Sequence, residues 1–151
     1  MKKFQYRLEG VLNYKNQVLD NLKSQQAEIA GRVIKKQQEV QNLKEEMLAY
    51  HDDFNQIKEK GDTSQSFRLY DLCICSIKQD LDREQERLRK LKREEEAKKK
   101  EVISAKIDTS RYEKLREKKL REYHKAALKA EETAVEEFVS GKTIRGASRK
   151  Q

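Results

Sequence analysis

Apolar residues recur along the first 57 residues in alternating steps of three and four, which is the pattern of a coiled-coil helix. Most residues between them are Lys, Glu, Gln, Asn or Asp. A repeat that averages about 3.5 residues predicts two helices supercoiled around one apolar seam. The fifteen seam positions, twelve of them apolar, are Leu8, Leu12, Lys15, Leu19, Leu22, Gln26, Ile29, Val33, Lys36, Val40, Leu43, Met47, Tyr50, Phe54 and Ile57.

A break at Gly61 predicts a turn between two helices. Lys58 and Lys60 suit the negative end of a helix, and Gly61 can adopt the left-handed conformation that ends one. Asp62 suits the N-cap of the next helix. Because the connection is short, we expect an all-α fold of two long helices in an antiparallel coiled-coil hairpin. The predicted bounds are a helix over 3–60, a turn at 61–62 and a longer helix over 63–140.

The second helix resumes the repeat and then loosens it. Its first eight seam positions, of which only Glu84 is charged, are Phe67, Tyr70, Ile74, Ile77, Leu81, Glu84, Leu88 and Leu91. Beyond Tyr112 the frame takes two steps of four, to Arg116 and Leu120, a stutter that relaxes the supercoil. Because this helix is longer, we expect residues 121–140 to extend past the first helix without a partner. The basic segment 141–151 contains two Gly residues and is expected to be a disordered tail.

The antiparallel register can be tested on the charged seam residues. A turn at 61–62 pairs positions whose numbers sum to about 124. This places three opposite-charge pairs along the hairpin: Lys15 with Asp108, Lys36 with Glu84, and Arg116 with Glu9. A parallel dimer, the structural alternative, would instead stack Lys15 on Lys15 and Lys36 on Lys36. The charges therefore favour the hairpin monomer.

Composition agrees with a narrow apolar seam rather than a rounded core. Charged residues make up 41% of the chain and hydrophobic residues 35%, with no Pro and no Trp. The strict periodicity argues against disorder despite the low hydrophobicity. The net charge of +8 is concentrated at 87–100, at 111–125 and in the tail. Such a basic surface suits acidic proteins, nucleic acid or anionic lipid, and a solvated helix surface is the simpler alternative.

The sequence offers little chemistry for catalysis. Cys73 and Cys75 lie two residues apart on a helix, so they point about 200° apart and can share neither a disulfide nor a metal. They are expected to be buried thiols. His51 and His124 each lack a second His one turn away. We therefore expect no enzyme activity, cofactor, metal or small-molecule substrate. The N-terminus shows no secretory signal-peptide pattern, and no apolar run is long enough to span a membrane.

Two stretches resemble the flagellar export protein FliJ family. Residues 4–12 follow its opening pattern of aromatic-x-aromatic-Arg-Leu-x-x-x-Leu. Residues 112–119 are similar to its Lys-Leu-x-Glu-Lys pattern, and Tyr123 and the pair Glu136-Glu137 follow in the expected order. The length, the single central turn and the basic tail agree, so the resemblance covers nearly the whole chain.

The resemblance implies a fold, a function and a location. FliJ proteins are antiparallel two-helix coiled coils similar to the stalk of rotary ATPases. They act in type III export, with their terminal end in the ring of the export ATPase FliI. They also contact the membrane gate protein FlhA and are linked to export chaperones. The chain would then lie in the bacterial cytoplasm, peripheral at the inner face of the membrane.

The resemblance also implies partner-binding residues. The gate-binding residues would be Tyr50, Phe54, Cys73 and Ile77. The residues facing the ATPase ring would be Arg7, Arg116, Lys118, Lys119 and Arg121. The seam pattern alternatively assigns Tyr50, Phe54 and Ile77 to the core. Cys73 departs from the family, which more typically has an aromatic residue there.

Other functions stay open at this stage. One is the equivalent stalk of a virulence-type secretion system. Another is a basic coiled coil that binds nucleic acid through phosphate contacts at 87–100 and 141–150. A third is a structural scaffold built from a parallel dimer. Because the resemblance covers both ends of the chain, it favours flagellar export, and nucleic acid is not the expected partner.

Overall fold

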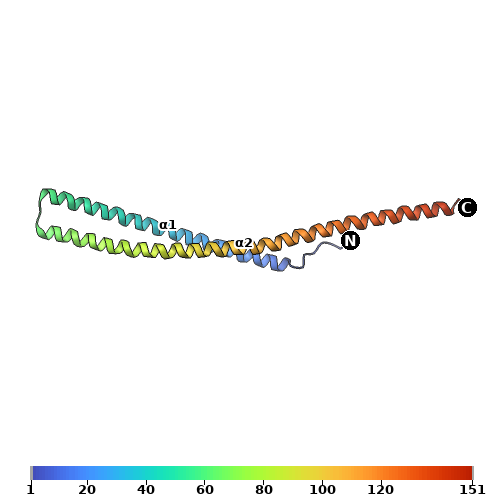
Figure 1. Cartoon of the computed structure of the whole chain (residues 1–151), viewed down its shortest axis with the longest axis horizontal. Coiled ribbons are helices and arrows are strands. Elements are labelled where there is room, and N and C mark those ends of the chain that lie inside the picture. Colours follow the sequence, from blue (N-terminus) through green and yellow to red (C-terminus); the bar gives the residue numbers. More distant parts are fainter. Residues whose placement is uncertain (1, 151) are drawn as a thin grey trace. The chain divides into compact units, whose positions relative to one another are not determined.

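The computed structural model describes residues 2–150, which form two helices and no strand. Helix α1 spans Glu9–Lys60 and helix α2 spans Ser64–Ser148 (Figure 1). The two helices pack against each other and α2 is the longer. The predicted all-α fold of two unequal helices is therefore confirmed.

The chain divides into two compact units. The turn unit comprises Asp20–Ser104, with the turn at its centre. The terminal unit comprises the described residues up to Leu19 together with those from Ala105 onward. Each unit contains a segment of α1 packed against a segment of α2.

In the turn unit, the predicted seam is the buried face of both helices. Every predicted seam position from Leu22 to Leu91 is buried or partly buried. The most buried apolar side chains of this unit are Val33, Val40, Ile77, Leu81 and Val102. The buried face repeats every 3.5 residues because only that spacing keeps one stripe of each helix on the other.

Helix α1 ends at the turn as the sequence predicts, but the residue that caps the start of α2 differs from the predicted one. Gly61 has a φ of 73°, the left-handed conformation, and its N–H donates to the Ile57 carbonyl at 2.9 Å. The N-cap of α2 is Thr63 rather than Asp62, because the Ser66 N–H donates to Thr63 Oγ1 at 3.4 Å. Asp62 instead accepts a hydrogen bond from the Thr63 N–H at 2.7 Å.

A charged pair crosses the seam of the turn unit where the sequence predicts one. Lys36 Nζ lies 2.7 Å from Glu84 Oε2 and 2.6 Å from Glu39 Oε2. The side chains of Lys36 and Glu84 are only 20% and 18% exposed. Hydrogen bonds to Glu39 and Glu84 raise the pKa of Lys36 above its usual value. The hydrogen bond from Lys36 lowers the pKa of Glu84.

This pair predicts a pH dependence of stability. Because the folded state lowers the pKa of Glu84, its contribution is present above the ordinary pKa of about 4.5 and is lost as the pH falls through the lower folded value. The folded state raises the pKa of Lys36. Its contribution to stability is therefore fully present below the ordinary value of about 10.5 and is lost as the pH rises through the higher folded value. We expect Glu84→Gln to lower the free energy of unfolding by about 1 kcal/mol at pH 7. The difference from wild type should disappear in acid.

Urea unfolding followed by circular dichroism measures this effect. Glu86→Gln is the matched control, because Glu86 lies on the same helix but pairs only with the exposed Arg89. If both variants show the same pH profile, the Lys36–Glu84 pair contributes nothing specific.

In the terminal unit, the same register continues. Lys15 Nζ lies 2.5 Å from Asp108 Oδ2, and Arg116 Nε lies 3.1 Å from Glu9 Oε2. The buried Thr109 satisfies its hydroxyl by donating to the Ala105 carbonyl at 2.8 Å. The predicted charged pairs of both units are thus present, and the antiparallel register is confirmed.

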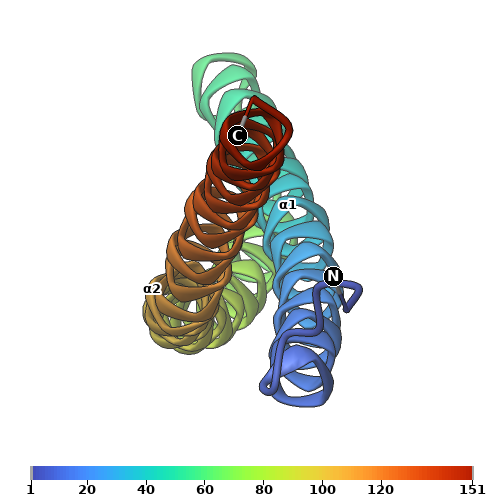
Figure 2. The same cartoon turned by 90° about the vertical axis from the view of Figure 1, so that its right-hand side faces the viewer.

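Helix α1 begins at Glu9 rather than at residue 3, and the residues before it are not helical (Figure 2). Tyr6 is buried and Phe4 is partly buried. Two residues at positions i and i+2 of a helix point in directions about 200° apart, whereas in an extended chain they lie on the same face. The extended form lets both aromatic rings pack on α2, which explains the later helix start.

Helix α2 ends at Ser148, so the end predicted at residue 140 is eight residues too early. Gly141 costs a helix interior only about 1 kcal/mol, and no Pro follows it. Lys142 Nζ lies 4.6 Å from the centre of the Phe138 ring, and Thr143 Oγ1 donates to the Val139 carbonyl at 2.9 Å. The residues after Gly141 are exposed, so we still expect these last turns to fray in solution.

Candidate partner-binding surfaces

The four candidate gate-binding residues all lie in the turn unit. Ile77 is core, with 8% of its surface exposed, while Tyr50, Phe54 and Cys73 are partly buried. Cys73 lies one helical turn before Ile77 on α2. Of the four, Ile77 is therefore the least accessible to a partner.

The aromatic candidates are held by a cluster next to the turn. The Tyr50 ring lies 6.5 Å from the Tyr70 ring, and the Phe54 ring lies 5.8 Å from the Phe67 ring, edge to face. Lys58 Nζ sits 4.4 Å from the centre of the Phe54 ring. Such pairs add about 0.5–1.5 kcal/mol each beyond their buried area. The cluster fixes the rings and leaves part of each exposed.

The turn unit also exposes apolar residues that the sequence reasoning missed. Leu48, Leu69 and Leu72 are each at least 60% exposed. Their signal in the sequence is that they are large aliphatic residues outside the seam. Leu69 and Leu72 lie one turn apart on α2, so they expose adjacent apolar surface and are candidates for a protein contact.

The candidate ATPase-binding cations lie in the terminal unit and differ in availability. Arg116 pairs with Glu9, and Lys119 Nζ lies 3.2 Å from Glu122 Oε2. Lys118 and Arg121 are exposed and form no ion pair with any other described residue. Arg7 is exposed on the non-helical segment that precedes α1. The structure brings Arg7 next to Arg116 and Lys119 in the hollows beside this segment, whereas Lys118 and Arg121 do not line those hollows.

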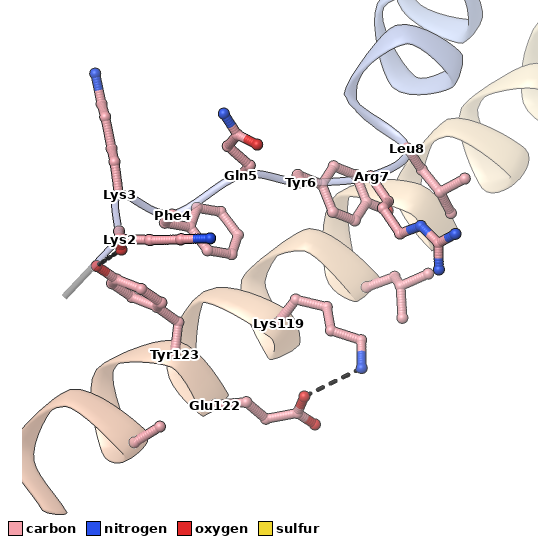
Figure 3. Close-up of a pocket in the computed structure, with 12 residues that line it drawn as sticks. Lys2, Lys3, Phe4, Gln5, Tyr6, Arg7, Leu8, Lys119, Glu122 and Tyr123 are labelled. Carbon is pink, nitrogen blue, oxygen red and sulfur yellow. Dashed lines mark hydrogen bonds and ion pairs between the residues drawn. The ribbon is translucent and has the colours of Figure 1, made fainter. Parts of the chain in front are cut away.

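The non-helical segment and α2 enclose an open hollow of about 1000 Å³ within the terminal unit (Figure 3). The Phe4 and Tyr123 rings lie 5.5 Å apart, and the Tyr123 hydroxyl donates to the Lys2 carbonyl at 2.7 Å. The Tyr6 hydroxyl donates to the Tyr112 carbonyl at 3.0 Å. The aromatic-x-aromatic pattern is thus an anchor for the start of the chain on α2. Three cations, Lys2, Lys3 and Arg7, line the hollow from the same segment.

The remaining candidate chemistry is sparse. Among residues 2–150, no three His, Cys, Asp or Glu side chains are grouped so that they could hold a metal ion. Both cysteines are free thiols. Cys73 is partly buried but Cys75 is exposed, so the expectation of two buried thiols is wrong for Cys75. Neither α1 nor α2, as described, has a stretch long and apolar enough to cross a membrane.

Comparison with known proteins identifies the family. The sequence matches the family described as "Flagellar FliJ protein" over residues 4–148 of its 151. Comparison with curated proteins and with solved structures gives no match. The match includes both helices, the turn and the aromatic segment before α1. The chain belongs to the FliJ family and is a coiled-coil protein associated with flagellar export.

Proposed function

We propose that this chain is a non-catalytic stalk of the flagellar type III export apparatus, which binds the hexameric ATPase FliI and modulates its ATP hydrolysis. The observation that carries the proposal is the family match over residues 4–148. The chain would lie in the cytoplasm, at the inner face of the membrane, held there by protein partners. It would link the ATPase to the gate protein FlhA and to export chaperones.

The terminal unit supports contact with the ATPase. Its part of α2 continues to Ser148, and every side chain from Leu128 to Ser140 is exposed. Among these, Leu128, Val135, Phe138 and Val139 are large and apolar. A helix that exposes this much apolar surface is typical of one that docks on a partner. Lys118 and Arg121 add unpaired positive charge on the same unit.

Native mass spectrometry tests the proposal. We expect one chain bound per hexamer when the purified protein is mixed with a FliI-type ATPase and a non-hydrolysable nucleotide. Free hexamer and free chain at micromolar concentrations of both would contradict the proposed function. Several chains per hexamer would contradict a central stalk.

The turn unit supports contact with the gate. Cys73 is only partly buried, and Leu69 and Leu72 beside it are exposed. We expect Cys73→Arg to weaken binding to the soluble part of a FlhA-type gate protein about tenfold, because a long charged group would intrude on an apolar contact. Isothermal titration calorimetry measures the change.

Cys75 supplies the matched control for that experiment. It is the same residue type two positions along the same helix, but it is exposed on another side. Cys75→Arg should bind the gate protein as wild type does, and both variants should keep the helical circular dichroism signal. Equal weakening by both variants would remove the assignment of Cys73 to the contact.

A further inference from the structure

A row of six cations runs along α2 in the terminal unit. Its members recur at spacings of three and four: Arg111, Lys114, Lys118, Arg121, Lys125 and Lys129. All six are exposed. At about 100° per residue they lie on one face, about 180° from the seam positions Thr109, Tyr112 and Arg116. This cation row is about 27 Å long at 1.5 Å per residue.

The cation row does not stabilise the free protein through ion pairs. None of its six side chains forms an ion pair with any residue in the described range 2–150. Neighbouring cations of the same unit behave differently, since Lys15, Arg116 and Lys119 are each paired. Like charges one helical turn apart repel, so an unpaired row slightly destabilises the isolated helix.

The row ends at a sharp change of sign. Glu132 and Glu136 continue the same face of α2 with the same spacing, and their sequence neighbours Glu131 and Glu137 project about 100° to either side of that face. These four carboxylates form an acidic block. All four are exposed, and they too form no ion pair with other residues of the described part. The boundary between the two charges falls between Lys129 and Glu131.

The two charges together indicate what kind of molecule fits this face. Nucleic acid or an anionic membrane is negative throughout, so it would attract the cation row but repel the acidic block. A second copy is a poor fit. Antiparallel docking that sets Lys129 against Glu132 also sets Lys125 against Glu136, but it leaves the other four cations of the row opposite residues 140–150, which contain four cations and no acid. Parallel docking in register would stack like charges. A protein surface that carries an acidic band followed by a basic band satisfies both.

We propose that the cation row and the acidic block dock on such a protein surface, and that the charge boundary near residue 130 sets how far along α2 the partner sits. On the proposed function, on which this inference rests, the partner is the wall of the ATPase ring. A shift of the partner along the helix would bring like charges together and is disfavoured. The inference adds Arg111, Lys114, Lys125 and Lys129 to the contact residues and assigns a role to the carboxylates that follow.

Two charge reversals with a matched control test the inference. The row variant carries Lys114→Glu, Lys118→Glu and Arg121→Glu. The control carries Lys90→Glu, Arg93→Glu and Lys100→Glu, which makes the same change in charge at exposed, unpaired positions of the turn unit. The block variant carries Glu132→Lys and Glu136→Lys. Circular dichroism checks that all three stay helical.

Affinity for a FliI-type ATPase is then measured by fluorescence anisotropy at low and at moderate salt. We expect the row variant to bind at least tenfold more weakly than wild type and the control within about twofold. The block variant should also bind more weakly, because its lysines would meet the basic band. Tighter binding by the block variant would overturn the inference, since it would indicate a uniformly acidic partner surface.

The failures of the inference and of the proposed function are distinguishable. If wild type binds the ATPase and the row variant binds no worse than the control, the inference alone is wrong. If wild type does not bind the ATPase, the proposed function is wrong and the inference with it. In that case, salt-sensitive binding of wild type to duplex DNA or to phosphatidylserine vesicles would assign the row to an anionic polymer or a membrane instead.

Discussion

Replacing Leu81 with Ala is expected to lower the free energy of unfolding by about 2–4 kcal/mol. Leu81 is 7% exposed and belongs to the seam of the turn unit, so the substitution removes buried methyl groups and leaves a cavity. Two packed helices can close such a cavity only in part, because the flanking seam residues keep them apart. Urea unfolding followed by circular dichroism measures the loss.

Leu72 provides the control for this experiment. It is the same residue type on the same helix and in the same unit, but it is 67% exposed. Leu72→Ala should change the free energy of unfolding by less than about 0.5 kcal/mol. Equal losses in the two variants would mean that the seam does not hold the helices together.

Deleting residues 127–151 is expected to abolish the stimulation of a FliI-type ATPase while leaving the packed helices intact. The last contacts between the N-terminal segment and α2 involve Tyr123, which packs on Phe4 and hydrogen-bonds to Lys2. Since side chains from Leu128 to Ser140 are exposed, their removal costs the fold little burial. Release of inorganic phosphate over time gives the rate of ATP hydrolysis with and without the shortened chain.

The unfolding transition of the shortened chain is the control. Its midpoint in urea should match that of the full chain, because the terminal unit keeps its contacts up to Tyr123. A shortened chain that is folded and still stimulates the ATPase fully would place the docking surface elsewhere. Loss of folding together with loss of stimulation would contradict the statement that this part of α2 is unpartnered.

Periodicity sufficed to predict the fold because a coiled coil is specified residue by residue. Each seam position is decided locally by its spacing, and the turn at Gly61 then determines the register. The Lys15–Asp108 and Lys36–Glu84 pairs follow from that register alone. Even the stutter is correct, since Arg116 and Leu120 are both partly buried.

The helix ends were predicted less well because local helix propensity competes there with the burial of side chains on the other helix. Residues before Glu9 could continue the helix, but burial of Phe4 and Tyr6 on α2 favours an extended chain. That preference depends on Tyr123, which lies more than a hundred residues away, so a local pattern cannot reveal it. At the other end, Gly141 is a weak helix breaker, and its cost is too small to end a helix by itself.

The candidate contact residues were also only partly predictable. The family resemblance assigned the cations near residues 116–121 to the ATPase as a group, so it placed Arg116 and Lys119 together with Lys118 and Arg121. Intramolecular pairing separates them, since the first two have carboxylate partners and the last two do not. Pairing depends on side-chain positions, and these follow only once the register of the two helices is fixed.

The most direct test of the account is the rate of ATP hydrolysis by a FliI-type ATPase with increasing amounts of the full chain. The account predicts that the rate rises and saturates near one chain per hexamer. It also predicts that moderate salt weakens the effect, because unpaired cations of the terminal unit contribute to docking. A rate that does not change at any ratio, with no complex formed, would contradict the central claim that this chain is a stalk of the export ATPase.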